Sequence, residues 1–207
     1  MNGGSQMQYL KDEVRKKILS SALIEFKNNG YLDTSMRTIA AKSGIALGST
    51  YRYFKSKEDL FNTLIEPVYN KLLLYVVKIQ VQVNNFTSKN CHEITKYIID
   101  ILNSIASFVK ESNNELLIIF NKSKGSKFEN FKKELVALVN DILIKYPNAE
   151  KIDDNTKIIV YTVSHDLVEG ISFILNQDYD GDKVKILINR LLYFYITDMT
   201  RIFDPKI

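Results

Sequence analysis

The chain has 207 residues, of which 45% are apolar and 11% aromatic, so it can bury a substantial core, and disorder is excluded as its main state. Its single cysteine, Cys91, excludes an intrachain disulfide and a disulfide-stapled secreted fold. The net charge of +4 lies in the first 62 residues, where ten Lys or Arg face six Asp or Glu. A polyanionic partner would therefore meet this first third, although charge alone is equally compatible with a basic surface that binds nothing.

Few residues interrupt the helical periodicity of the chain. It contains three Pro and eight Gly, and its apolar residues recur with a period of 3.6, which predicts an all-α protein. The segment from Met1 to Lys17 carries charges where a secretory signal needs apolar residues, and no stretch approaches the ~18 uninterrupted apolar residues of a membrane span. A cytoplasmic protein without a membrane partner is expected.

The first third of the chain predicts several short helices in close succession. They cover residues 9–28, 34–42 and 46–54, with a fourth helix starting at 57. Gly30 can end the first helix in a left-handed conformation, Thr34 or Ser35 can cap the second, and Ser56 with Asp59 has the spacing of a capping box. Two short helices joined by a tight turn that contains glycine, behind a longer packing helix, indicate a helix-turn-helix.

The outer face of the third helix carries side chains suited to nucleic acid. Small residues let a helix enter a major groove, hydroxyl and guanidinium groups can address base edges or phosphates, and Tyr and Lys can hold the backbone. A purely structural helix more often shows Glu and Lys on this face. The residues concerned are Leu47, Gly48, Ser49, Tyr51 and Arg52, followed by Tyr53, Lys55 and Lys57.

The segment from Ile18 to Leu64, above all TSMRTIAAKSGIALGSTYRYFKSKEDL from Thr34 to Leu60, resembles the DNA-binding domain of the tetracycline-repressor (TetR) family of bacterial transcription regulators. The matching elements are Phe26, Gly30-Tyr31, Thr34, Ile39-Ala40, Gly44, Gly48, Tyr51, Tyr53-Phe54, Lys57-Glu58 and Leu60. Two positions depart from the family pattern: Ala46 replaces a capping Ser, and Thr50 replaces a large aliphatic residue that packs inward. Loss of the cap predicts a recognition helix that is less stable by about 1 kcal/mol.

The resemblance implies that residues 1–56 bind palindromic or near-palindromic double-stranded operator DNA as half of a homodimer. The half-sites are expected roughly 34 to 36 Å apart, or modestly further apart if two dimers bind together. The family's DNA contacts carry over to Ser35, Arg37, Leu47, Gly48, Ser49, Tyr51, Arg52, Tyr53 and Lys57. Arg37 and the start of the third helix are expected at base edges or phosphates, and the later residues, through Lys57, at phosphates. Leu47 either touches a thymine methyl or is an ordinary exposed leucine, and Tyr53 either binds phosphate or packs in the core.

Residues 57–207 are expected to form a helical ligand-binding and dimerisation domain. Its helices are predicted over residues 57–84, 92–110, 114–122, 128–146, 155–176 and 182–203. Pro67 predicts a kink in the first of these, which the resemblance makes the link between the domains. The last two helices are unusually apolar, and the resemblance implies that they form a four-helix bundle across a two-fold axis. The alternative is that both pad the core of a monomer.

The resemblance also implies a pocket among the middle helices, whose small-molecule effector releases the DNA. The candidate lining residues are amphipathic or apolar: Tyr69, Leu73, Tyr97, Ile101, Ile105, Phe108, Phe120, Phe131, Tyr161, His165 and Phe173. Most of them are expected to be core, because a stripe at helical spacing usually packs. No acidic cluster accompanies them, so a largely apolar effector is expected, with Tyr161 and His165 as its polar partners. The competing interpretation is a regulator whose C-terminal domain only dimerises or docks a protein.

No catalytic, cofactor or metal site is expected, and the protein is predicted not to be an enzyme. The run Ser164-His165-Asp166 is not a catalytic triad, because adjacent helical residues point about 100° apart and triad partners must converge. His165 and Glu169 share a helix face, but two ligands make a weak metal site, and Cys91 with His92 are too few as well. Repression of transcription is the usual outcome in the family that the chain resembles.

Overall fold

The computed structural model describes residues 3–85, 91–145, 153–177 and 179–202. Within these ranges the chain forms helices joined by turns and contains no strand. The helices are α1 (Gly3–Asp33), α2 (Met36–Ser43), α3 (Leu47–Tyr53), α4 (Lys57–Asn84), α5 (Cys91–Glu111), α6 (Asn113–Asn121), α7 (Phe131–Lys145), α8 (Asp154–Leu175) and α9 (Gly181–Ile202). The predicted all-α class is confirmed.

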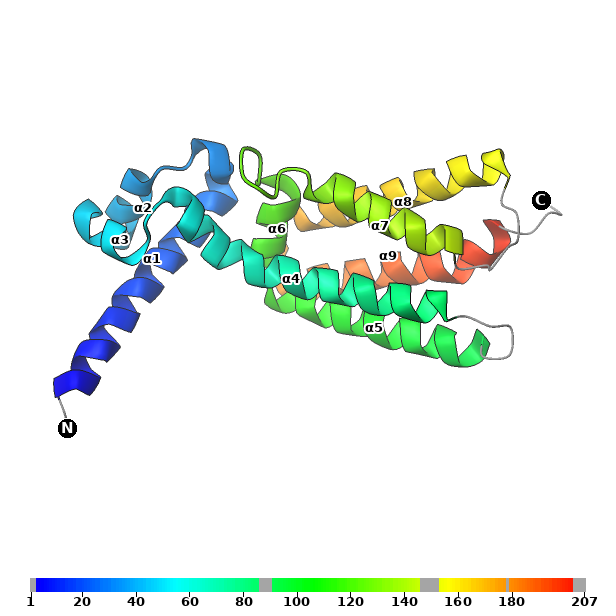
Figure 1. Cartoon of the computed structure of the whole chain (residues 1–207), viewed down its shortest axis with the longest axis horizontal. Coiled ribbons are helices and arrows are strands. Elements are labelled where there is room, and N and C mark those ends of the chain that lie inside the picture. Colours follow the sequence, from blue (N-terminus) through cyan, green and yellow to red (C-terminus); the bar gives the residue numbers. More distant parts are fainter. Residues whose placement is uncertain (1–2, 86–90, 146–152, 178, 203–207) are drawn as a thin grey trace.

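The molecule is elongated, with the three N-terminal helices at one end and a helical bundle at the other (Figure 1). Helix α4 starts beside α1–α3 and runs into the bundle as one continuous helix through Pro67. In the bundle α5 packs against α9, α7 against α8, and α8 against α9. The short helix α6 lies across the junction and contacts α1, α4 and α8. Both α4 and α6 therefore connect the two ends.

Gly30 produces the predicted break in α1. Its φ of 77° and ψ of 171° are non-helical and lie in a region that is essentially restricted to glycine. The next residue, Tyr31, donates its backbone N–H to the carbonyl oxygen of Lys122 at 2.8 Å, just beyond the end of α6. A Cβ added at Gly30 would lie 3.3 Å from the same oxygen. The end of α1 is thus attached directly to the end of α6.

A row of aromatic rings joins the helix-turn-helix to the bundle through α4. Phe61 is fully buried, and its ring lies 4.8 Å from that of Phe26 and 4.7 Å from that of Tyr31, both on α1. On the other side its ring lies 6.1 Å from Phe128, which in turn is 5.2 Å from Tyr69. Such edge and tilted contacts are favourable ring geometries. One apolar core therefore continues from α1–α3 into the bundle.

Helix α7 begins at Phe131, three residues later than the sequence predicts. Two serines in the preceding segment bond to the backbone: Ser123 Oγ donates to the carbonyls of Ile119 and Phe128, and Ser126 Oγ donates to the carbonyl of Ser123. Serine hydroxyls compete in this way with helical hydrogen bonds and favour turns. The turn that contains Gly125, where φ is 82°, extends through residue 130 for this reason.

Among the described helices, α8 is long and apolar enough to cross a membrane when judged by length and composition alone. A criterion of uninterrupted apolar residues does not detect it, because isolated charges interrupt the run. Only 28% of its most apolar window is buried within the protomer, although α8 packs against α6, α7 and α9. Its apolar character therefore exceeds what packing inside one protomer requires.

Candidate nucleic-acid interface and internal cavity

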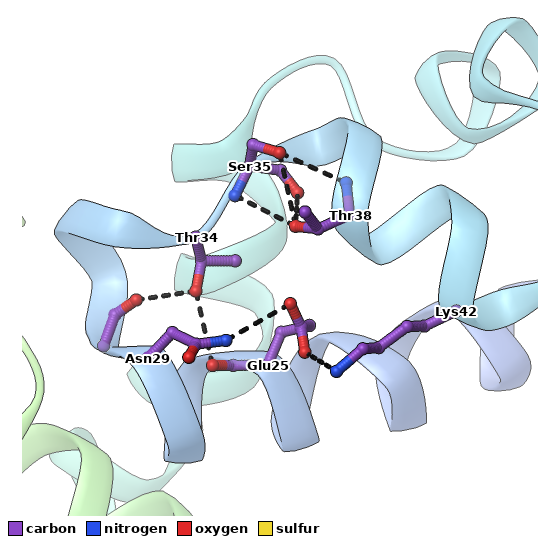
Figure 2. A network of polar contacts seen from close by, with 7 residues as sticks. Glu25, Asn29, Thr34, Ser35, Thr38 and Lys42 are labelled. Carbon is purple, nitrogen blue, oxygen red and sulfur yellow. Dashed lines mark hydrogen bonds and ion pairs between the residues drawn. The ribbon is translucent and has the colours of Figure 1, made fainter.

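Helix α2 begins at a complete capping box (Figure 2). Ser35 Oγ accepts the N–H of Thr38 at 3.1 Å, and Thr38 Oγ1 accepts the N–H of Ser35 at 3.2 Å. The neighbouring candidate cap, Thr34, is buried, and its hydroxyl donates instead to the carbonyl of Gly30 at 2.7 Å. Of the two predicted caps, Ser35 is therefore the one used. Ser35 was also a predicted DNA contact, and it is exposed while its hydroxyl serves this cap.

A buried carboxylate fixes α2 against α1. Glu25 is 2% exposed, and its carboxylate pairs with the ammonium of Lys42 and accepts a hydrogen bond from Asn29 Nδ2 at 3.4 Å (Figure 2). A buried charge is tolerated only when it is paired in this way, so the pair orients the two helices. Sequence analysis missed this role of Glu25. The available signal was a charged residue directly beside Phe26 on the apolar face of α1.

Helix α3 presents one continuous exposed face. At about 100° per residue, Leu47, Gly48, Tyr51 and Arg52 fall within one half of the helix circumference, and all four are exposed. Thr50 points the other way and is fully buried, with its hydroxyl bonded to the Ala46 carbonyl at 3.2 Å. This arrangement is what a helix needs to enter a groove while its opposite side packs on the domain.

The remaining predicted DNA contacts lie around this face. Arg37 is exposed in the first turn of α2, Ser49 is half-buried, and Tyr53 is partly buried against the core. Ala46 makes no side-chain cap to α3, as the departure from the family pattern predicts.

Gly48 is not required by the fold. A Cβ built on it would meet nothing within 4 Å, and its backbone is helical. Glycine within a helix costs roughly 0.5 to 1 kcal/mol relative to alanine. A glycine that destabilises an exposed helix is favoured where another molecule must approach the helix backbone closely.

We expect Gly48→Ala to stabilise the protein by up to about 1 kcal/mol, because it removes the glycine penalty, and to weaken DNA binding, because the methyl group separates α3 from the groove. Urea unfolding and fluorescence anisotropy with a duplex selected from a random library measure the two effects. Ser20→Ala, on the exposed side of α1, is the control and leaves DNA affinity unchanged. A Gly48→Ala variant with lower stability or unaltered DNA affinity would contradict this role.

Lys57 is directed toward the end of α1. Its ammonium donates to the carbonyls of Tyr31 at 2.7 Å, Leu32 at 3.2 Å and Thr34 at 2.9 Å, and it lies 4.4 Å from the centre of the Tyr31 ring. These bonds use all three ammonium hydrogens. Burial lowers the pKa of Lys57 from its ordinary value. Lys57, which was expected at a phosphate, thus holds the first turn of α4 to carbonyls at and just after the end of α1 in this structure.

Substitution of Lys57 distinguishes these two roles. Lys57→Gln is expected to lower the free energy of unfolding by about 1 to 3 kcal/mol, because charged hydrogen bonds to the α1 carbonyls are lost. A phosphate contact would instead reduce the slope of log affinity against log salt by about 0.9 for each lysine. The control is Lys78→Gln, an exposed lysine of α4 within the bundle, which is expected to leave both the stability and the slope unchanged. A reduced salt slope with unchanged stability would show that Lys57 serves DNA rather than α1.

Helices α4 to α9 enclose an apolar cavity of about 160 Å³. Helix α4 contributes Leu72, Val76, Ile79 and Val83, and most of the remaining lining is aliphatic. An engineered cavity of about 150 Å³ with comparable walls in another protein stays dry and binds small apolar molecules. This cavity therefore offers a site for an apolar ligand.

Two of the eleven predicted ligand contacts, Ile105 and Phe120, line the cavity. Five others lie elsewhere in the bundle: Tyr69, Leu73, Ile101, Phe108 and Phe131. The rings of Phe120 and Phe131 lie 5.1 Å apart, so Phe131 supports the wall from behind. The last four are exposed: Tyr97, Tyr161, His165 and Phe173. Periodicity cannot select the inward face of a helix that is apolar on several sides, and α8 is such a helix.

Tyr195 of α9 is the lining residue with a polar side chain, and it is not among the predicted ligand contacts. Burial raises the pKa of this hydroxyl, and the nearby charge of Asp166 adds to the effect. Tyr195 follows Ile188 and Leu192, both buried cavity residues, at i+7 and i+3 spacing. That shared face was the signal in the sequence. Tyr195 can thus supply the hydrogen bond expected from Tyr161 and His165.

The residues considered for metal or catalysis are not assembled into a site. His165 Nδ1 lies 3.2 Å from Asp166, whereas Glu169 pairs with Lys132 at 2.9 Å. Among the described side chains, no group of three or more His, Cys, Asp or Glu could hold a metal ion. The side chains of Cys91 and His92 lie outside the described part of the chain.

Large apolar side chains lie exposed on α8 and α9. They are Ile158, Ile159, Tyr161 and Phe173 of α8, and Ile186, Tyr193 and Phe194 of α9. Phe173, for example, is 68% exposed. Monomeric soluble proteins rarely expose so many large apolar residues on adjacent helices, and such surfaces mark interaction sites.

Sequence comparison finds its strongest similarity to known proteins in the N-terminal part of the chain. A profile of bacterial regulatory proteins of the tetR family matches residues 18–64. The HTH-type transcriptional regulator YdgC of Bacillus subtilis (strain 168) is 25% identical over 131 residues, 63% of this chain and 64% of YdgC. AcrR of Shigella flexneri, also an HTH-type transcriptional regulator, is 41% identical over 54 residues, 26% of this chain and 25% of AcrR. Each match thus spans less than two thirds of the relative.

Solved structures share the fold over nearly the whole chain. A TetR-like transcriptional regulator from Rhodococcus sp. RHA1 has a TM-score of 0.55 at 18% identity, covering 89% of this chain and 96% of that one. NalD of Pseudomonas aeruginosa, the secondary repressor of the MexAB-OprM multidrug efflux pump, has a TM-score of 0.51 at 15% identity, covering 88% and 95%. Together with the helix-turn-helix geometry, the profile match shows that residues 18–64 carry the helix-turn-helix domain of the tetR family of bacterial regulatory proteins, and the whole chain shares the fold of TetR-like transcriptional regulators.

Proposed function

We propose that this protein is a DNA-binding transcription regulator, a homodimeric repressor that leaves its operator when a small, largely apolar molecule fills the cavity. The observation that carries the proposal is that one helix, α4, lines the cavity from Leu72 to Val83 and is bonded to the helix-turn-helix at Lys57. An effector that moves α4 therefore also moves α3. The alternative, a C-terminal domain that only dimerises or docks a protein, gives no reason for a cavity with apolar walls.

In this proposal residues 1–56 form the DNA-binding domain and residues 57–207 the ligand-binding and dimerisation domain. The exposed face of α3 enters the major groove, with Arg37 beside it and Ser49 and Tyr53 at its margins. Two copies related by a two-fold axis bind half-sites roughly 34 to 36 Å apart. The affinity falls steeply with salt, because Lys and Arg release counterions from phosphates. Such a regulator acts in the cytoplasm, where the DNA lies.

The end of α6 supplies a second connection between cavity and DNA-binding domain. Three successive residues face three different neighbours: Phe120 lines the cavity, Asn121 Oδ1 accepts a hydrogen bond from Ser172 Oγ of α8 at 2.6 Å, and the Lys122 carbonyl accepts the Tyr31 N–H. A ligand that displaces Phe120 therefore also shifts the end of α1, through the hydrogen bond between Lys122 and Tyr31. The coupling free energy of such linked sites is typically about 1 to 3 kcal/mol.

The cavity chemistry favours an apolar effector with one hydrogen-bonding group for Tyr195. Its walls supply no charged side chain among the described residues, so a charged ligand would lose its hydration without compensation. Solved structures with the same fold include a gamma-butyrolactone receptor, with a TM-score of 0.54 at 18% identity over 90% of this chain and 86% of that one. A largely apolar small molecule that carries a polar head is consistent with this relationship.

A thermal-shift screen of hydrophobic drugs, fatty acids and aromatic metabolites, followed by operator competition, tests the proposal. Val168 lines the cavity on α8 and is 1% exposed, so Val168→Phe fills part of the space, whereas Val77→Phe places the same change on the exposed side of α4. An effector is expected to raise the melting temperature of the wild type and of Val77→Phe but not of Val168→Phe, and to lower operator affinity about 5- to 150-fold. Equal stabilisation of all three proteins, or unchanged operator affinity with every stabilising compound, would refute the effector part.

A further inference from the structure

Helix α1 extends well beyond the domain that it supports. Among the side chains of α1 that the structure describes, the most N-terminal fully buried one is Ile18, and those of residues 8 to 17 are exposed or half-buried. At a rise of 1.5 Å per residue, the ten helical steps from Gln8 to Ile18 span about 15 Å. Figure 1 shows this segment projecting clear of α2, at the end of the molecule where α3 lies. We call residues 8–17 the α1 arm.

The buried face of α1 continues into the arm as a basic face. At about 100° per residue, Lys11 and Arg15 fall on the same side of the helix as the buried Ile18 and Ala22. The Arg15 guanidinium still contacts the helix-turn-helix, 5.2 Å from the ring centre of Phe54, the residue directly after α3. Lys11 lies one turn further out, where no helix of the domain covers it. The arm therefore points basic groups past the end of the recognition helix.

The α1 arm carries more basic than acidic side chains, and its lysines are available to an acidic partner. It carries four bases, Lys11, Arg15, Lys16 and Lys17, and two acids, Asp12 and Glu13. Asp12 accepts a hydrogen bond from Gln8 at 3.3 Å, and Glu13 bonds the Tyr9 hydroxyl. Among the described residues, the ion pairs include none of the arm's lysines. The basic groups are thus left to a partner with negative charge.

We propose that the α1 arm binds the phosphate backbone of the duplex outside the half-site that α3 contacts, with Lys11 as its principal contact. The inference rests on the proposed position of α3 in the major groove. Double-stranded DNA is the polyanion that this end of the molecule already meets, and it continues beyond the operator on both sides. An arm of this length reaches flanking phosphates without any change in α3.

The test compares two duplexes that share a core site selected by the wild-type protein from a random library. One ends at the core, and the other carries about eight additional base pairs on each side, which at 3.4 Å per pair exceeds the reach of the arm. The wild type is expected to bind the longer duplex more tightly. Lys11→Gln is expected to remove that preference and to reduce the slope of log affinity against log salt by about 1.8, for two contacts per dimer at 0.9 each. Lys11 is exposed, so the variant keeps its fold, which circular dichroism checks.

Lys27→Gln, on the far side of α1 and away from the arm, is the matched control and keeps both the slope and the length preference. If Lys11→Gln retains the wild-type slope and length preference, the arm does not contact DNA and the inference is overturned. A change confined to self-association in sedimentation would equally overturn it, because the arm would then bind a second copy of the chain. Failure of the wild type to select any duplex would refute the proposed DNA-binding face of α3 itself.

Discussion

Phe173→Asp is expected to convert the dimer to a monomer and to lower operator affinity by at least about 100-fold. Phe173 is 68% exposed on α8, so the protomer does not need it for folding. In the proposed four-helix interface it is buried against the partner, where a carboxylate without a counter-charge is costly. A monomer also loses the simultaneous engagement of two half-sites, which is worth about 10² to 10⁴ in affinity.

Sedimentation at micromolar concentration and anisotropy with the selected duplex measure the two losses. Leu74→Asp is the control, because Leu74 is a comparably exposed apolar residue, at 53%, on α4 rather than on α8 or α9. It is expected to leave the dimer and its DNA affinity intact. A Phe173→Asp protein that still sediments as a dimer with wild-type DNA affinity would show that α8 and α9 are not the interface.

Gly30→Ala is expected to destabilise the protein by about 1 to 3 kcal/mol, because the residue adopts a backbone conformation that is essentially restricted to glycine. Its φ is 77° and its ψ is 171°, and the new Cβ would lie 3.3 Å from the Lys122 carbonyl oxygen. The same corner carries the Tyr31 to Lys122 hydrogen bond and the carbonyls that bind Lys57. DNA affinity is therefore expected to fall as well.

Gly44→Ala is the matched control for this change. Gly44 ends α2 with a φ of 69° and a ψ of 17°, the left-handed helical conformation, and nothing lies within 4 Å of an added Cβ. Its cost is expected to be about 1 kcal/mol, from backbone strain alone. Denaturant unfolding of the two variants gives the comparison. Equal losses at the two glycines would mean that the contact between α1 and α6 adds nothing to stability.

The helix-turn-helix was predictable because its signals are local. Gly30 breaks α1, Ser35 and Gly44 determine the two ends of α2, and Ser56 determines the start of α4. Each acts through its own backbone conformation or side-chain bonds, so the sequence alone predicts these features. The start of α7 was placed too early because Ser123 and Ser126 bond to the backbone and extend the turn that precedes it. Sequence rules use the type of each residue, but they do not predict which backbone carbonyl a serine hydroxyl will bind.

The cavity lining was less predictable, because it depends on how the helices pack. Tyr161 and Tyr195 are chemically alike, yet one is 56% exposed on α8 and the other lines the cavity from α9. Helix α8 has apolar residues on both its inner and outer faces, so periodicity does not select between them. The bonds of Lys57 to residues 31, 32 and 34 likewise join segments more than 20 positions apart. Such contacts follow from the tertiary structure alone.

The central claim is that the cavity and the DNA-binding face are coupled, and titration calorimetry of one closed cycle tests it most directly. The affinity of a cavity-binding compound is measured with and without saturating operator duplex, and that of the duplex with and without saturating compound. The account predicts that each ligand weakens the other by the same factor, about 5- to 150-fold. A compound that binds the wild type but not Val168→Phe, and leaves both affinities unchanged, would contradict it.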